Sequence, residues 1–217
     1  GYYASSVLQG EFLPNGSVRW EFGYNANQDI INSMQLDGEE IWLSTAGRGL
    51  WSIDIANRVL SPTPAALHSQ MDGMILEDDG TMYVGLMGSQ GSAAGFQTFD
   101  TSSRTWGQGS LIAGLPNNIV RGFVEHDDHI MVATWGGIGL WNTTKDGWDD
   151  PITTIDGLPT PIVDHLFTID TPIQGNGTVL VGGPAGLTVL HQDNLSILTT
   201  LNFADGLVGN TVSGITY

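Results

Sequence analysis

An internal repeat constrains this chain more than any other sequence feature. Each copy has an apolar alternating run, an Asp/Gly turn, a second apolar run, a Gly-rich turn and a third run. The second run begins at Ile41, Met82, Ile130 and Val179, so the spacings are 41, 48 and 49 residues. Such runs predict short antiparallel strands, and this period with several strands per unit is typical of a β-propeller. We therefore expect an all-β fold in which residues 1–217 form one propeller domain.

The two ends of the chain together match one more repeat. Residues 211–217 correspond to a first strand and residues 1–6 to a second, while residues 11–13 and 17–22 supply the third and fourth. This phase predicts about five four-stranded blades, with the last blade closed by both termini, since closure removes exposed strand edges. The alternative is a partial ring cut from a larger propeller.

The charge balance excludes several classes of partner. The chain has 6 Lys and Arg residues against 23 Asp and Glu residues, a formal net charge of −17. A nucleic-acid-binding protein needs basic residues to neutralise phosphates, so no nucleic acid is expected. No apolar stretch reaches the ~18 residues of a membrane-spanning helix, so no membrane insertion is expected. The absence of Cys excludes disulfides, thiolate metal sites and Cys nucleophiles.

Two segments carry a family resemblance. Residues 114–123, continuing through 130–141, and residues 157–166 share a Gly-Leu-Pro turn before an apolar strand and an aromatic strand before a Gly-rich turn. They resemble the two-component-regulator propeller repeat. Departures are His129, where a turn Gly is usual, and residues 171–177, which replace an Asp-Gly turn; members of that family often have seven blades.

The resemblance implies a sensor or ligand-binding module that is extracellular, periplasmic or on the cell surface, as in bacterial sensors that respond to glycans. Four sequons, at Asn15, Asn142, Asn176 and Asn194, agree mildly with that setting. The motif residues occupy turn and core positions, so they predict the fold better than they predict a ligand.

Ligands of propellers usually bind at the axis, on the face formed by the loops that enter each innermost strand and those that join the second and third strands. Arg48 and Trp135 lie in the second set of loops, where an aromatic face and a guanidinium suit a sugar ring or a carboxylated ligand. The alternative for Trp135 is packing between blades. Asn117, Arg121 and His165 complete the predicted ligand-binding set, for an oligosaccharide or a protein ligand.

Two carboxylates on innermost strands offer a different class of function. Asp72 and Asp164 could serve as general acid and base of a carbohydrate-active hydrolase or lyase if they lie about 5–9.5 Å apart. Arg121, between them in sequence, could instead pair with Asp164, which favours a non-catalytic module. A third alternative is a structural cell-surface or protein-interaction domain.

No metal site or cofactor is predicted. The His126 and His129 side chains lie on a strand or turn, where residues three apart do not share a face. The acidic turns at residues 78–80 and 127–128 do not match the spaced loop of a strong calcium site, which leaves only weak calcium binding. Among the Gly-rich turns, Gly139 is expected to have positive φ.

Overall fold

The computed structural model describes residues 6–12, 14, 18–25, 29–87, 95–107, 114–173 and 176–215. Within them are four four-stranded antiparallel sheets and one two-stranded hairpin. The first two blades are β3 (Ile31–Asp37), β4 (Glu40–Thr45), β5 (Leu50–Asp54) and β6 (Val59–Pro62), then β7 (Met71–Leu76), β8 (Thr81–Leu86), β9 (Phe96–Asp100) and β10 (Thr105–Trp106). The next two are β11 (Val120–His126), β12 (His129–Thr134), β13 (Gly137–Asn142) and β14 (Gly147–Ile152), then β15 (His165–Ile173), β16 (Asn176–Gly183), β17 (Gly186–His191) and β18 (Ile197–Leu201).

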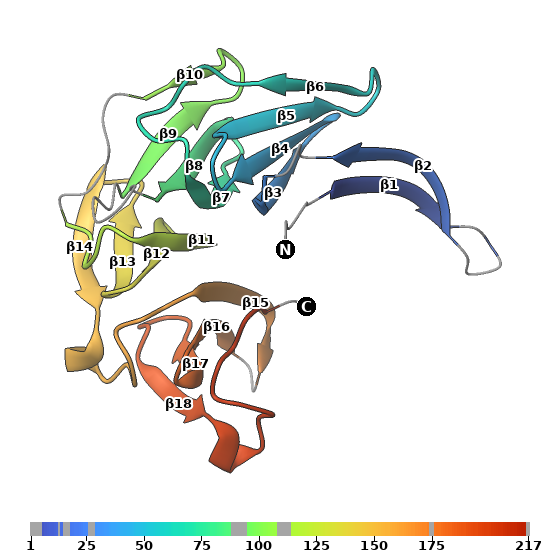
Figure 1. Cartoon of the computed structure of the whole chain (residues 1–217). Helices are drawn as coiled ribbons and strands as arrows, with labels where there is room; N and C mark the ends of the chain where they lie inside the picture. The colour runs from blue at the N-terminus through green and yellow to red at the C-terminus, as the bar shows by residue number, and fades with distance from the viewer. Residues whose placement is uncertain are drawn as a thin grey trace.

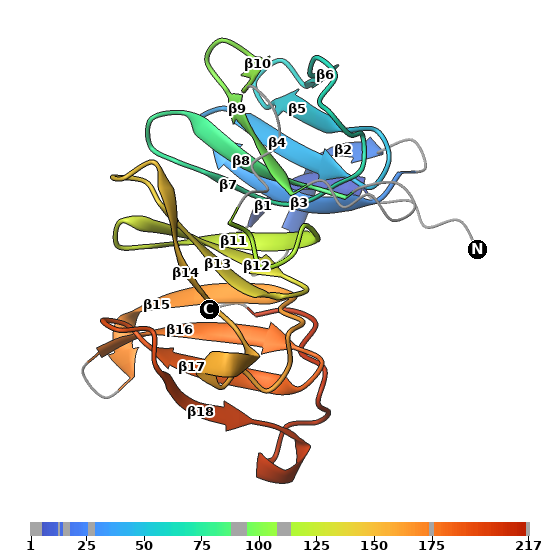
Figure 2. The same ribbon diagram turned by 90° about the vertical axis from the view of Figure 1, so that its left-hand side faces the viewer.

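The blades stand around a common axis as an open arc (Figure 1). Consecutive innermost strands, β3, β7, β11 and β15, contact one another, and Figure 2 shows the sheets from the side. The predicted all-β propeller architecture is confirmed, and the second strand of each blade covers its predicted position. No helix in the described part of the chain is long and apolar enough to cross a membrane.

The composite fifth blade is not formed by the described residues. The hairpin of β1 (Ser6–Phe12) and β2 (Val18–Asn25) is a separate two-stranded sheet, and residues 211–215 belong to no strand. The backbone N–H of Val212 instead donates to the Gly183 carbonyl at the end of β16, at 3.1 Å. One blade earlier, the backbone N–H of Val163 donates in the same way to the Thr134 carbonyl at the end of β12, at 2.9 Å. The segment after β18 is therefore hydrogen-bonded to the β15–β18 blade, from which it emerges. Residues 1–5 and 216–217, which the predicted closure also uses, lie outside the described residues.

The hydrophobic core lies between blades. Three clusters of buried side chains each join two neighbouring blades, represented by Trp42 with Met82, Phe96 with Val132, and Met131 with Val181. Because both faces of a blade pack on neighbours, an interior strand such as β13 is buried at every position. This packing explains why the apolar runs in the sequence are nearly continuous.

The loops between blades are built by short-range capping. In η1 (Thr154–Asp156), Thr153 and Asp156 form a capping box, and Gly157 follows with a φ of 105°. The same arrangement recurs in η2 (Phe203–Asp205) with Asn202, Asp205 and Gly206. In the first of these loops, the Leu that follows the Gly, Leu158, is buried in the core between blades. The Gly-Leu signal of the repeat is thus a cap followed by a core anchor.

The expectation of a positive φ at Gly139 is wrong. The left-handed residue of that turn is Gly137, with a φ of 127°. Gly139 is required for packing instead, because a Cβ there would lie 2.9 Å from Trp148 and 3.0 Å from Leu115.

Candidate functional site

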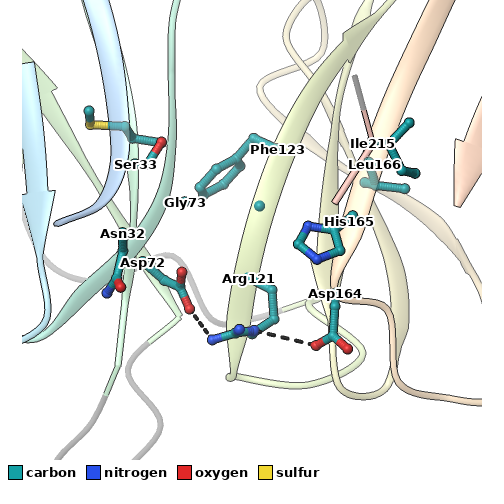
Figure 3. A pocket seen from close by; sticks show the side chains of 12 residues that line it. Asn32, Ser33, Asp72, Gly73, Arg121, Phe123, Asp164, His165, Leu166 and Ile215 are labelled. Atoms are coloured by element: carbon teal, nitrogen blue, oxygen red, sulfur yellow. Dashed lines mark hydrogen bonds and ion pairs between the residues drawn. The ribbon is translucent and has the colours of Figure 1, made fainter. Parts of the chain in front are cut away.

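One repeat position brings polar side chains to the propeller axis. The register of the innermost strand shifts beside Asn32 in β3, Asp72 in β7 and Arg121 in β11. Such bulges leave a residue unpaired and turn its side chain away from the sheet ladder. Asp164 occupies the corresponding place just before β15. Figure 3 shows these side chains gathered from four blades.

Close approach of the innermost strands depends on a small residue next to the bulge. A Cβ on Gly73 would lie 2.6 Å from both the Arg121 carbonyl oxygen and the Gly122 Cα. Glycine therefore lets β7 contact β11. His165 occupies the equivalent position on β15, where its ring reaches the axis beside Asp164 (Figure 3).

Arg121 holds both axial carboxylates. Its Nη1 donates to the Asp72 carboxylate, and its Nε lies 3.4 Å from Asp164 Oδ1 (Figure 3). The Nε atom is buried and makes no well-aligned hydrogen bond, so its contact with Asp164 is an ion pair only. Arg121 does pair with Asp164, the alternative that the sequence left open, and Asp72 is an additional partner.

Burial perturbs the titration of two axial groups. Burial raises the pKa of Asp72, an effect that Arg121 opposes and Asp164 reinforces. Burial likewise lowers the pKa of His165, against the effect of Asp164. The axis therefore favours a neutral imidazole and resists two free carboxylates side by side.

These groups line a polar cavity of about 220 Å³. Its wall also includes apolar side chains, among them Phe123, Leu166 and Ile215 (Figure 3). Two carboxylates, one guanidinium and a neutral imidazole give a net charge of about −1. Such a cavity offers hydrogen-bond donors and acceptors to a hydroxyl-bearing ligand and has no excess positive charge for an anion.

Trp135 is not buried between blades but is partly exposed. It lies in the turn between β12 and β13, and 45% of its surface is exposed. The backbone N–H of Trp135 donates to the Ile119 carbonyl at 3.3 Å. The backbone N–H of Ile119 donates in turn to Asn117 Oδ1 at 2.8 Å. Asn117 therefore shapes the loop beside Trp135 and leaves the indole exposed on the loop face.

Arg48 lies in the equivalent turn of the first blade, between β4 and β5, and is exposed. Its backbone is bound on both sides, because its N–H donates to Thr45 Oγ1 at 2.9 Å and its carbonyl accepts from the Trp51 indole at 3.0 Å. It lines a cavity of about 210 Å³ that is separate from the axial one. The predicted binding residues thus divide between the axis and the loop face.

The two histidines that flank the β11–β12 turn make different contacts. His126 Nε2 lies 2.7 Å from the Gln192 carbonyl oxygen on the next blade. His129 lies between Asp128 and Asp149, with each ring nitrogen 2.8 Å from a carboxylate oxygen. Nowhere among the described residues do three or more His, Asp or Glu side chains form a group that could hold a metal ion.

Sequence reasoning missed a contact between the first two blades. Arg104, in the turn before β10, bonds Glu40 at 2.9 Å and Ser52 Oγ at 2.5 Å. Its guanidinium also lies 5.0 Å from the centroid of the buried Trp42 ring. Arg58 occupies the equivalent turn position of the first repeat, with the same left-handed backbone, so periodicity identifies the turn position but not the partners of Arg104.

The fold and the axial cavity define a β-propeller with polar groups at its axis. No protein-family model matches the sequence, and no curated protein matches it. The chain is similar in structure to the extracellular domain of a protein named as a hybrid two-component system of B. thetaiotaomicron, with a TM-score of 0.64 and 15% identity. It is similar to the extracellular domain of a protein named as a one-component system of the same organism, with a TM-score of 0.62 and 17% identity.

These comparisons differ in how much of each chain they cover. The similarity spans 93% and 84% of this chain but only 25% and 23% of the two B. thetaiotaomicron chains. A computationally designed protein named Ika4 matches over 76% of this chain and 93% of its own, with a TM-score of 0.55 and 12% identity. At these identities the comparisons establish the propeller-like fold.

Proposed function

We propose that this chain is a non-catalytic ligand-binding module of the extracellular sensor type, and that its ligand is an oligosaccharide bound on the loop face. The observation that carries the proposal is the exposed indole of Trp135. A large aromatic side chain that is partly exposed on the loop face suits stacking on a sugar ring.

The state of the axial carboxylates supports a module without catalysis. Asp72 and Asp164 both contact the Arg121 guanidinium. A glycosidase needs one carboxyl group that can protonate the leaving oxygen and a second that can act as a base or nucleophile. Carboxylates that share one guanidinium are better suited to holding three blades in position.

The structural neighbours support the proposed extracellular setting. Both B. thetaiotaomicron chains are extracellular domains of sensor systems. The low proportion of basic residues, 6 against 23 acids, makes the surface unsuited to nucleic acid or anionic lipid. The ligand can be neutral or anionic, but an anionic sugar needs local positive charge to offset the repulsion from a net charge of −17.

Calorimetry and product analysis on one panel of neutral and anionic oligosaccharides test the proposal. We expect reversible binding, weakened roughly tenfold in Trp135→Ala because stacking contributes about 1 kcal/mol or slightly more. Trp135→Phe keeps an aromatic face and should retain most of the affinity. Shortened products that disappear in Asp72→Asn or Asp164→Asn would establish an enzyme instead, and silence in both assays would favour a structural or protein-interaction domain.

A further inference from the structure

A second cavity opens on the loop face between the first two blades. It has a volume of about 210 Å³ and lies between the β4–β5 turn and the segment that links β6 to β7. Arg48 and His68 are its ionisable lining residues, and Leu50, Pro64 and Ala66 give it an apolar wall. It is distinct from the axial cavity, with which it shares no lining residue.

The distribution of charge makes this cavity unusual for the molecule. Lys145, Arg104 and Arg121 each form an ion pair with a carboxylate. In the described part of the chain, the Arg48 guanidinium and the His68 ring have no such pair and no hydrogen bond. Although acids outnumber Lys and Arg by 23 to 6, none lines the cavity.

Acidic side chains line two other cavities of the described residues. Asp72 and Asp164 face the axial one, and Asp37, Glu77 and Asp78 face one beside the β3–β4 turn. The acid that contacts the Arg48 turn is Asp29, and both of its oxygens accept backbone hydrogen bonds, from Ile30 at 2.9 Å and Gly47 at 3.2 Å. Among the described residues, Arg48 is thus left without a counterion.

The walls of the cavity are held by bonds that leave these two side chains unused. The Pro64 carbonyl accepts from the Trp106 indole at 2.8 Å, and the N–H of Leu67 donates to Gln97 Oε1 at 3.2 Å. The Ser69 carbonyl accepts from the N–H of Gly49 at 2.7 Å. A preformed wall lowers the entropic cost of ordering a ligand.

We propose that this cavity binds the carboxylate group of a ligand, with Arg48 as its counterion and His68 as a second donor. A planar guanidinium pairs with a carboxylate through two parallel hydrogen bonds. The apolar wall fits the carbon skeleton next to that group. A monoanion is favoured over a phosphate dianion because the field of a −17 chain repels a double charge more strongly.

The inference deepens the proposed function, and it rests on that function where it assigns the carboxylate to a sugar acid. The carboxylate site itself can be tested without an oligosaccharide. Glucuronate and glucose form a matched pair that differ at one carboxylate, acetate carries the carboxylate without the ring, and inorganic phosphate represents the competing anion.

The test follows the Arg48 side-chain Nε–H signal by NMR at constant ionic strength. We expect saturable shifts with glucuronate and acetate, none with glucose or chloride, and weaker binding of phosphate. Arg48→Gln should weaken glucuronate binding by about tenfold or more. Lys145→Gln, an equal charge change on an exposed side chain outside the cavity, should change it by less than about twofold.

Each outcome separates this site from the oligosaccharide function. Carboxylate binding that is lost in Arg48→Gln supports the inference even if no oligosaccharide binds. Trp135-dependent binding of neutral oligosaccharides without any effect of carboxylates would refute the inference and leave the proposed function in place. Equal losses in Arg48→Gln and Lys145→Gln, or tighter binding of phosphate than of glucuronate, would also overturn it.

Discussion

Replacing Glu77 by Gln should stabilise the protein at neutral pH. Glu77 directly follows β7 and is partly buried. Burial, reinforced by the nearby Glu125, Asp79 and Asp78, raises its pKa from 4.5 to about 6. One of its oxygens, Oε1, is buried without a hydrogen-bond partner. An ionised Glu77 therefore costs the folded state free energy that a neutral amide does not.

The magnitude and its pH dependence follow from the pKa. A rise from 4.5 to about 6 corresponds to about 2 kcal/mol, and partial exposure to solvent reduces this to about 1 kcal/mol. Because the folded state retains the proton to higher pH than the unfolded chain, stability falls as pH rises through that window. The penalty is fully present above about pH 6 and absent below about pH 4.5.

Urea unfolding monitored by tryptophan fluorescence, repeated across pH, measures this difference. Glu77→Gln should exceed the parent by about 1 kcal/mol at neutral pH, and the gap should vanish in acid. Glu39→Gln, the same change at an exposed turn position, is the matched control and should show no such gap. A gap independent of pH, or a less stable Glu77→Gln, would refute the assignment of the cost to ionisation.

Two further predictions concern a turn and a surface ion pair. Gly186→Ala should lower the free energy of unfolding in urea by about 2 kcal/mol or more, because Gly186 has a φ of 120° and a Cβ there would collide with the Leu201 carbonyl oxygen. Gly206 has a φ of 105° but open space around it, so Gly206→Ala should cost only about 1 kcal/mol. Equal costs for the two variants would contradict the collision. Hydrogen bonds from His129 and Lys145 lower the pKa of Asp149 to about 2. Asp149 should therefore stabilise the fold above about pH 4, and this stabilisation should be lost as pH falls through about 2. Thermal unfolding of Asp149→Asn should show a loss of stability that shrinks in acid, whereas a loss that is the same at every pH would point to lost packing instead.

Local patterning was enough to predict the architecture. The second apolar runs, which begin at Ile41, Met82, Ile130 and Val179, become the second strands β4, β8, β12 and β16. These features are readable because strand and turn preferences act over a few residues and recur in every repeat. The same reasoning placed Asp72, Arg121 and Asp164 on innermost strands, since equivalent repeat positions face the same axis.

The sequence alone therefore determined the strands of four blades, the acidic composition and the residues that face the axis, all of which depend on local composition and period. Only the tertiary structure decided that Arg121 holds both carboxylates, that Trp135 is exposed, that Arg104 links two blades, and that the segment after β18 bonds back to its own blade. Those outcomes depend on contacts between blades, where a shift of a few ångströms exchanges one partner for another. Repeat periodicity specifies which residues are equivalent but not which of them meet.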